Sequence, residues 1–257
     1  MILGCDIGTS VTKAVLFEEG RFLCGLKTGT EANPDKALDK LLGELLRERG
    51  LREADLAEIV VTGWGQGKVS LRHKTMATMN CLGRAAVWDV PSCRSVLCLG
   101  AQQSVVLSVN ERGRVLEYRM NDKCASGAGK FLELIFEALG CEVEESARIA
   151  KSADKRVAVT SQCTVFAESE VVSLVNDGES VANITEAILE ALSKSVTTLC
   201  KKIKVEAEFV IGGGIANNQR VVEQLEEGLG RRLHVFRPQP SFIAAVGAAL
   251  SAKGDGV

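Results

Sequence analysis

The chain has 257 residues, 46% of them hydrophobic and 25% charged, a length that suits one large domain or two modest ones with a substantial core. Lys and Arg number 31 against 33 Asp and Glu, so the formal net charge of −2 leaves no basic surplus for a phosphate backbone. No stretch approaches the roughly 18 apolar residues of a membrane span, and the N-terminus lacks the pattern of a secretion signal. We therefore expect a cytoplasmic protein that binds neither nucleic acid nor membranes.

The nine cysteines are spread through the chain without a CxxC pair. An odd number without paired spacing argues against a disulfide framework and against a zinc ribbon. Free cysteines commonly act as small buried hydrophobic residues, which is the expectation for Cys5, Cys24, Cys93, Cys141 and Cys200.

The first elements form an antiparallel meander followed by a helix and a strand. Apolar runs separated by polar glycine turns predict strands at residues 2–6, 12–17 and 22–26. A 3.6-residue apolar stripe predicts a helix over 34–49 that ends at Gly50, and a further strand at 57–62 leads into a glycine-rich loop. Residues 80–95 contain Pro91 and few periodic signals, so we expect a hinge or domain boundary there.

The strand and turn pattern of the first residues returns about 93 residues later, which predicts an internal duplication. The repeated strands are expected at 95–99, 105–109 and 115–120. The remaining elements are helices at 130–139, 165–176, 183–203, 219–229 and 242–253, with short strands at 209–211 and 233–236. The first two of these helices each follow a polar loop that carries a cysteine, Cys124 and Cys163 respectively.

Two glycine-containing turns are candidate nucleotide sites. In the first, Gly8, Thr9 and Ser10 offer backbone and hydroxyl donors to an anion, and Asp6 at the strand end can hold a metal-bound water. In the second, Gly212, Gly213 and Gly214 leave bare backbone at the start of a helix. Tight-turn geometry alone also explains each motif. Together with the duplicated hairpin, they favour a nucleotide cleft between two similar halves.

Five segments taken together resemble a known family over nearly the whole chain. They are DIGTSVTKAVL, MNDKCASGAGKFLE, SQCTVFAESEVVSL, GGGIANN and VGAAL. They are similar to the ATPase activators of 2-hydroxyacyl-CoA dehydratases and the related ATPase subunits of benzoyl-CoA reductase, the BadF/BadG/BcrA/BcrD type. The resemblance implies an α/β fold of duplicated ribonuclease H-like halves around a nucleotide cleft, as in the acetate kinase, sugar kinase, Hsp70 and actin superfamily. We expect a first half at 1–92, with the C-terminal helix at 241–257 packing back on it, and a second half at 93–240.

The resemblance also implies a function in anaerobic metabolism. Cys124 and Cys163 from each subunit of a homodimer would hold one 4Fe–4S cluster, and ATP would drive a low-potential electron from a ferredoxin or flavodoxin donor to a partner iron–sulfur enzyme. A cysteine at the first turn of a helix suits this role, because the positive end of the helix dipole faces a negatively charged cluster. The nucleotide, as ATP or ADP with Mg²⁺, would be bound by Gly8, Thr9, Ser10, Lys13, Gly100, Gln102, Gly212, Gly213, Gly214 and Asn218, with Asp6 as the candidate catalytic residue.

The second hairpin departs from the family pattern. Members read Ile-Asp-Ile-Gly-Gly-Gln-Asp-Ser-Lys, whereas Cys98, Gln103 and Val105 stand here in place of the two acids and the lysine. Magnesium prefers hard oxygen ligands, which a neutral thiol does not supply. A nucleotide-binding, cluster-carrying regulatory module with little or no ATP hydrolysis is therefore a second interpretation. A small-molecule kinase of the same superfamily is a third, but it leaves the two cysteine-headed helices unexplained.

Overall fold

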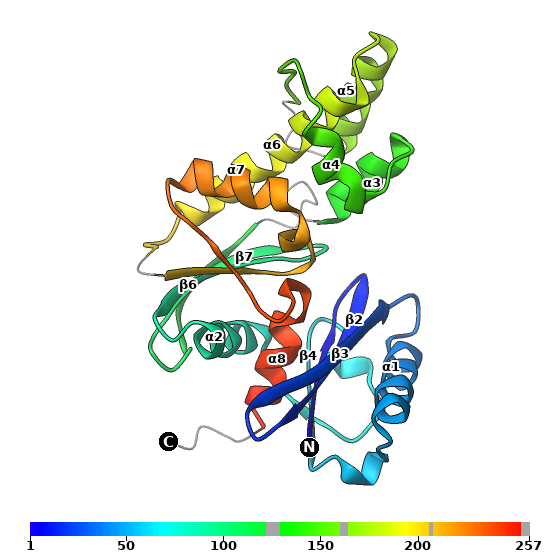
Figure 1. Ribbon diagram of the computed structural model, residues 1–257, viewed down its shortest axis with the longest axis vertical. Helices are drawn as coiled ribbons and strands as arrows, with labels where there is room; N and C mark the ends of the chain where they lie inside the picture. Colours follow the sequence, from blue (N-terminus) through cyan, green and yellow to red (C-terminus); the bar gives the residue numbers. More distant parts are fainter. Residues whose placement is uncertain (122–128, 160–163, 206–207, 253–257) are drawn as a thin grey trace.

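A computed structural model describes residues 1–121, 129–159, 164–205 and 208–252 (Figure 1). The first of two five-stranded sheets has the strand order β3-β2-β1-β4-β5. Its strands are β1 (Ile2–Ile7), β2 (Val11–Glu18), β3 (Arg21–Gly29), β4 (Glu58–Thr62) and β5 (Lys74–Thr75). The first three strands pair antiparallel, and β4 runs parallel to β1. The predicted meander is therefore present.

The second sheet repeats this topology with the strand order β8-β7-β6-β9-β10. Its strands are β6 (Cys93–Leu99), β7 (Ser104–Val109), β8 (Val115–Met120), β9 (Glu208–Gly212) and β10 (His234–Val235). The central strand β6 pairs antiparallel with β7 and parallel with β9, as β1 does with β2 and β4. The matching order confirms the internal duplication. The first lobe is thus built on β1 to β5, and the second lobe on β6 to β10.

Eight α-helices connect and cover the strands in the part of the chain that is described. They are α1 (Pro34–Arg49), α2 (Thr78–Asp89), α3 (Gly129–Ala138), α4 (Ser146–Ala150), α5 (Thr164–Asn176), α6 (Val181–Cys200), α7 (Gln219–Leu229) and α8 (Ile243–Leu250). Helix α2 occupies most of the segment that the sequence predicts as a hinge. The helix buries mainly small residues, including Cys81, Ala85 and Ala86, which give a weak apolar stripe. The short helix α4 has no counterpart among the predicted elements.

Helices α2 and α8 lie side by side between the two sheets (Figure 1). A Cβ atom at Gly247 of α8 would overlap the backbone carbonyl of Cys81 in α2, so glycine is what lets the two helices approach. On its other side α8 meets β1, where a Cβ at Gly4 would overlap the Ala245 carbonyl. The C-terminal helix thus packs against the first sheet, and α2 packs against the second.

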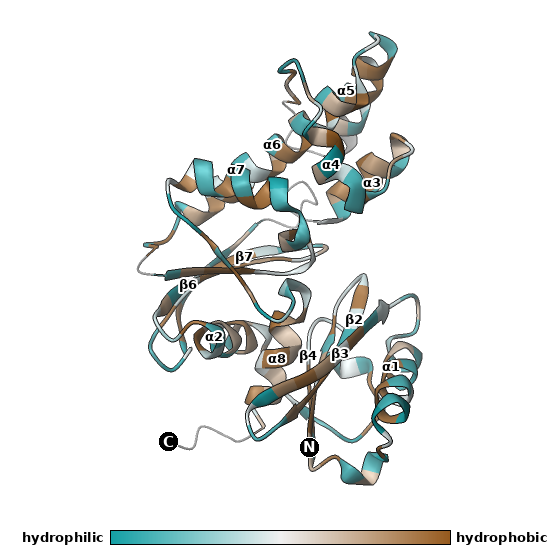
Figure 2. Cartoon of the chain, in the orientation of Figure 1, coloured by the Kyte–Doolittle hydropathy of each residue, from teal (hydrophilic) through white to brown (hydrophobic). Residues whose placement is uncertain are grey.

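The outer faces of the sheets are covered by amphipathic helices. Helix α1 places Leu38, Leu41 and Leu45 on the first sheet, and its ends are fixed by the Asn33 cap and by Gly50 in the left-handed conformation. Helices α6 and α7 cover the second sheet. In Figure 2 the strands and α8 are largely apolar, whereas α1 and α7 carry hydrophilic residues along their length. None of the helices in the described ranges is both long and apolar enough to cross a membrane.

Candidate functional site

Asp6 and Lys13 form an ion pair beneath the first glycine turn. They are direct partners across β1 and β2, with 2.8 Å between the Asp6 Oδ2 and Lys13 Nζ atoms. Their side chains are only 11% and 15% exposed respectively, so the pair is shielded from water. A Cβ atom at Gly8 would lie 3.0 Å from Lys13 Nζ and 2.6 Å from the Val11 carbonyl oxygen. Glycine therefore lets the ammonium group lie against the turn, where it can attract an anion.

The turn is held in shape by Thr30, which sequence reasoning did not identify. Its buried hydroxyl donates a hydrogen bond to the Gly8 carbonyl at 2.8 Å and lies 3.0 Å from the Thr12 hydroxyl. The Thr30 backbone N–H donates to the Ser10 carbonyl at 2.9 Å. Thr9 and Ser10 themselves stay partly exposed at the turn. The first turn is thus a braced, partly open loop of polar residues.

The second hairpin has the same geometry with neutral side chains. Cys98 and Val105 are direct partners across β6 and β7, in the positions that Asp6 and Lys13 hold across β1 and β2. The Gly100 N–H donates to the Gln103 carbonyl at 2.9 Å, which closes the turn, and Gln102 is exposed at its tip. The second hairpin therefore holds a neutral pair at the positions where the first hairpin holds an ion pair.

The two turns lie close enough to influence each other electrostatically. Burial raises the pKa of the Cys98 thiol to about 12, with a further increase from Asp6 and a decrease from Lys13. The ion pair of the first lobe therefore acts on a side chain of the second lobe. Because its pKa is so high, Cys98 is a neutral thiol at pH 7, and a neutral thiol does not replace a carboxylate as a ligand for Mg²⁺.

Glycines at equivalent places follow β4 and β9, and both have positive φ angles. A Cβ at Gly63 (φ +95°) would lie 2.5 Å from Asp6 Oδ1, and one at Gly213 (φ +93°) would overlap the Leu99 carbonyl. Within the triple glycine, a Cβ at Gly212 would meet Ile243 at 2.8 Å, whereas a Cβ at Gly214 would meet no atom within 4 Å. Protein packing thus explains Gly212 and Gly213, and Gly214 alone borders open space.

Asn218, predicted as a nucleotide ligand, caps a helix. Its Oδ1 accepts a hydrogen bond from the Val221 N–H at 3.1 Å, at the start of α7, and its Nδ2 donates to the Ser146 hydroxyl at 2.8 Å. Both ends of the amide therefore have protein partners, and a role toward the nucleotide stays a prediction.

The predicted metal ligands Cys124 and Cys163 lie outside the described residues, but the residues next to these segments are placed. Asn121 donates its N–H to the Ser104 carbonyl at 3.1 Å, Gly129 to the Gly100 carbonyl at 2.9 Å, and Lys130 to the Ala101 carbonyl at 2.7 Å. Helix α5 begins at Thr164, directly after Cys163. The rest of the chain, as far as it is described, holds no cluster of three His, Cys, Asp or Glu side chains suited to a metal ion.

The whole chain is similar to known proteins. Residues 3–252 match the model of the BadF/BadG/BcrA/BcrD ATPase family. The 2-hydroxyisocaproyl-CoA dehydratase activator of Clostridioides difficile is 32% identical over 254 residues, covering 97% of this chain and 94% of that protein. One of the subunits of the benzoyl-CoA reductase of Thauera aromatica is 31% identical over 257 residues, covering 96% of this chain and 91% of that protein.

Solved structures agree with the sequence relatives. The Clostridium difficile activator with bound ADPNP superimposes with a TM-score of 0.92 at 30% identity, covering 98% of this chain and 93% of that one. A glucokinase of the ROK family from Streptomyces griseus shares the fold alone, with a TM-score of 0.58 at 12% identity, covering 98% and 99%. The predicted fold, two duplicated α/β halves of the sugar kinase, Hsp70 and actin type, is therefore confirmed.

Proposed function

The chain belongs to the BadF/BadG/BcrA/BcrD ATPase family, and on this basis we propose that it is an ATP-dependent activator that donates a low-potential electron to a partner iron–sulfur enzyme of the dehydratase or reductase type. One relative is named as the activator of a dehydratase and another as a subunit of a reductase, which supports a partner of the dehydratase or reductase class. A reduced ferredoxin or flavodoxin is the proposed electron donor.

The proposed nucleotide site lies between the two lobes. Lys13 lies against the Gly8 turn, where its ammonium group would attract the phosphates, and the backbone at Gly214 borders open space. Asp6 supplies the hard oxygen ligands that Mg²⁺ or its bound water requires. A related activator binds an ATP analogue, which supports the same ligand here.

The cofactor fits the chemistry of the two cysteine segments. Cys124 and Cys163 from each of two chains would give four thiolates, the ligand set of a 4Fe–4S cluster, and a homodimer places them around one axis. When bound, such a cluster supplies one electron at low potential. Gly129 and Thr164 begin α3 and α5 soon after the two cysteines in the sequence, and the positive end of a helix dipole at these starts would favour a negatively charged cluster.

Two backbone hydrogen bonds next to the Cys124 segment support a coupling between nucleotide binding and electron donation. The residues on both sides of the Cys124 segment are hydrogen-bonded to the second turn. The Asn121 N–H donates to the Ser104 carbonyl, and the Gly129 N–H donates to the Gly100 carbonyl. Any shift of the Gly100 turn when a nucleotide binds is therefore passed to both ends of the cysteine segment. Changes in backbone dipoles and solvent access around a cluster alter its potential, which gives the nucleotide control over the electron.

The test is iron and sulfide analysis of protein purified without oxygen. We expect about four irons and four sulfides per two chains, in the ratio that a shared 4Fe–4S cluster requires. Cys124→Ser and Cys163→Ser should each lose the iron, whereas Cys141→Ser, which removes a partly buried free thiol, should retain it. Iron-free wild-type protein from a strictly anaerobic preparation would refute the proposal.

A second candidate is a cluster-carrying regulatory module that binds nucleotide with little or no hydrolysis. The neutral Cys98 and Val105 pair, in the place of a second ion pair, favours it. Steady-state ATPase assays on the iron-loaded protein separate the two candidates. An ATP-dependent activator must turn over ATP, whereas a regulatory module need not.

A further inference from the structure

Strand β8 forms an open edge of the second sheet. It stands at the end of the strand order, and no other strand in the described ranges pairs with its outer side. Leu116 is 68% exposed and Tyr118 is 47% exposed, high values for such large apolar and aromatic side chains. The register with β7 shifts between Ser108 and Val109, which leaves Leu116 without a direct partner in that strand. Such an edge exposes unpaired backbone groups and is a template for another strand.

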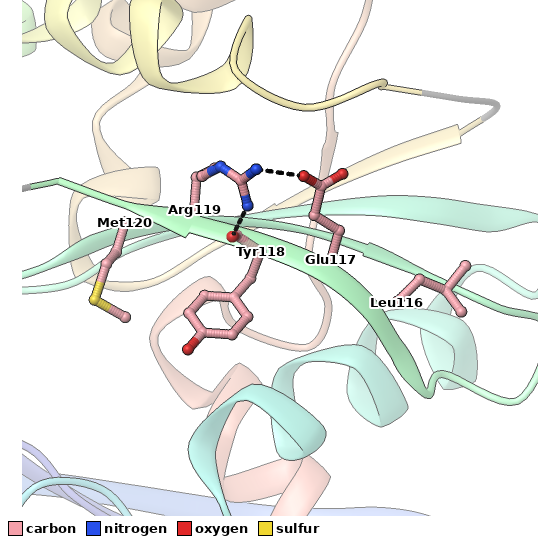
Figure 3. Close-up of a pocket in the computed structure, with 5 residues that line it drawn as sticks. All are labelled: Leu116, Glu117, Tyr118, Arg119 and Met120. Carbon is pink, nitrogen blue, oxygen red and sulfur yellow. Dashed lines mark hydrogen bonds and ion pairs between the residues drawn. The ribbon is translucent and has the colours of Figure 1, made fainter.

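The side chains of this edge alternate in chemistry. The residues Leu116 to Met120 line a shallow hollow along the strand (Figure 3). Figure 3 shows Glu117 and Arg119 pointing to one side of the strand, joined by a 2.7 Å ion pair, and Tyr118 and Met120 pointing to the other. The strand thus has a charged face with one group of each sign and an apolar face centred on an aromatic ring.

We propose that this edge is a contact surface for a second copy of the chain, with the two β8 strands pairing antiparallel around a two-fold axis at Tyr118. In this register Glu117 of each copy stands opposite Arg119 of the other, on the same face of the joined sheet. The two Tyr118 rings meet at the axis, and Leu116 of each copy stands opposite Met120 of the other. Opposite charges and aromatic or apolar pairs are the cross-strand combinations that stabilise an antiparallel sheet.

The neighbouring registers are unfavourable, which makes the pairing specific. Directly opposite residues of an antiparallel pair lie on the same face, so the two-fold axis of a symmetric contact passes through a residue and not between two residues. The smallest shift in register therefore moves the axis from Tyr118 to Glu117 or to Arg119. The first shift places Glu117 opposite its own copy, and the second does the same for Arg119. Like charges directly opposite each other destabilise a strand pair. Only the axis at Tyr118 pairs each charge with its opposite.

This contact is separate from the cluster-bridged dimer of the proposed function. The chain leaves β8 at Met120 and continues toward the Cys124 segment, so antiparallel β8 strands direct the two chains toward opposite ends of the joined sheet. The β8 contact would therefore join two cluster-bridged dimers, or two iron-free chains, through a second isologous interface. It does not depend on the cluster.

The test is sedimentation velocity of chelator-treated, iron-free protein over a range of concentrations. We expect a reversible dimer that Glu117→Arg or Arg119→Glu weakens about tenfold or more, because each change places like charges opposite each other twice. The combined Glu117→Arg and Arg119→Glu variant exchanges the charges and should regain wild-type association within about twofold. Glu48→Arg on α1 makes the same charge change on a distant exposed residue and should leave association unaltered. A wild-type protein that stays monomeric, or a double variant as weak as the single ones, would overturn the proposal.

Disulfide trapping tests the axis itself. Tyr118→Cys should form a disulfide between two copies under mild oxidation, identified as a peptide linked to itself by mass spectrometry, whereas Leu116→Cys, two positions from the axis, should not link to itself. The reverse pattern would contradict the proposed register. Iron content under anaerobic conditions should be the same in all these variants, so failure of the strand contact and failure of the cluster proposal give different results.

Discussion

Asp6 and Lys13 form a buried ion pair across β1 and β2, and Cys98 and Val105 stand in the corresponding positions across β6 and β7. One lobe thus presents a carboxylate and an ammonium group toward the region between the lobes, and the other presents a neutral thiol and a methyl-bearing side chain. Since Asp6 acts on the Cys98 thiol across the lobes, the two positions share one electrostatic environment. We expect the rate of ATP hydrolysis to depend on this asymmetry.

Restoring the second pair should raise the ATPase rate. Combining Cys98→Asp with Val105→Lys rebuilds the charges of the first lobe, and a correctly placed carboxylate and ammonium group typically change a rate by about tenfold or more. Cys98→Asp alone adds a second carboxylate near Asp6 without its own cation, so the gain should be smaller. Phosphate release is the measurement. If neither variant hydrolyses ATP faster than wild type, the missing carboxylate does not limit turnover.

Removing the cation of the first lobe should destabilise the fold. Lys13→Met leaves the Asp6 carboxylate buried without its partner, and losing one member of a shielded ion pair costs about 3 kcal/mol. Adding Asp6→Asn to Lys13→Met removes the uncompensated charge and should recover part of the free energy of unfolding. Guanidinium denaturation of the three proteins checks this. Equal stability of wild type and Lys13→Met would show that water already solvates Asp6.

Neighbouring glycines of the triple motif should respond differently to the same substitution. Gly213→Ala combines a positive φ with overlap of the Leu99 carbonyl, so we expect a loss of about 2 kcal/mol or more. Gly214→Ala adds a methyl group where no atom lies within 4 Å and should leave stability nearly unchanged. If a nucleotide lies against this backbone, Gly214→Ala should weaken nucleotide binding, measured by calorimetry. Unchanged affinity in a folded Gly214→Ala protein would place the nucleotide elsewhere.

Glu179 should make stability dependent on pH in the acid range. Hydrogen bonds from Asn183, Lys155 and Ser180 at the start of α6 hold its pKa at about 2, below the ordinary value of 4.5. Because the folded-state pKa is lowered, the stabilising contribution is complete above 4.5 and is lost as the pH falls toward 2. Glu179→Gln should therefore be less stable than wild type at pH 7, and the difference in urea midpoints should shrink on acidification. A difference that is the same at pH 7 and pH 3 would contradict this.

Sequence reasoning located every described strand except the two-residue β5, and most helices, because most strands carry apolar runs and helices such as α1 and α7 are amphipathic. It missed α2, whose buried face consists mainly of small residues and whose partner, α8, lies near the C-terminal end of the described chain. The glycine that permits this contact, Gly247, is explained only by the position of the Cys81 carbonyl. Helix packing between distant segments has no local signal.

The candidate site could be predicted in part. Asp6, Gly8 and Lys13 follow one strand end and its turn, so their proximity could be derived from the hairpin alone. Thr30 could not, because its bond to the Gly8 carbonyl is created by the pairing of β2 with β3. Cys124 and Cys163 stay predictions as cluster ligands, because both lie outside the described residues.

Nucleotide control of electron donation is tested most directly by a redox titration of the anaerobic, iron-loaded protein followed by EPR, carried out once with ADP and once with ATP. We predict the signal of a reduced 4Fe–4S cluster, equivalent to one cluster per two chains, with a midpoint potential that differs between the two nucleotides. The same midpoint potential with both nucleotides at saturating concentration, or the absence of any cluster signal, would contradict the proposed function.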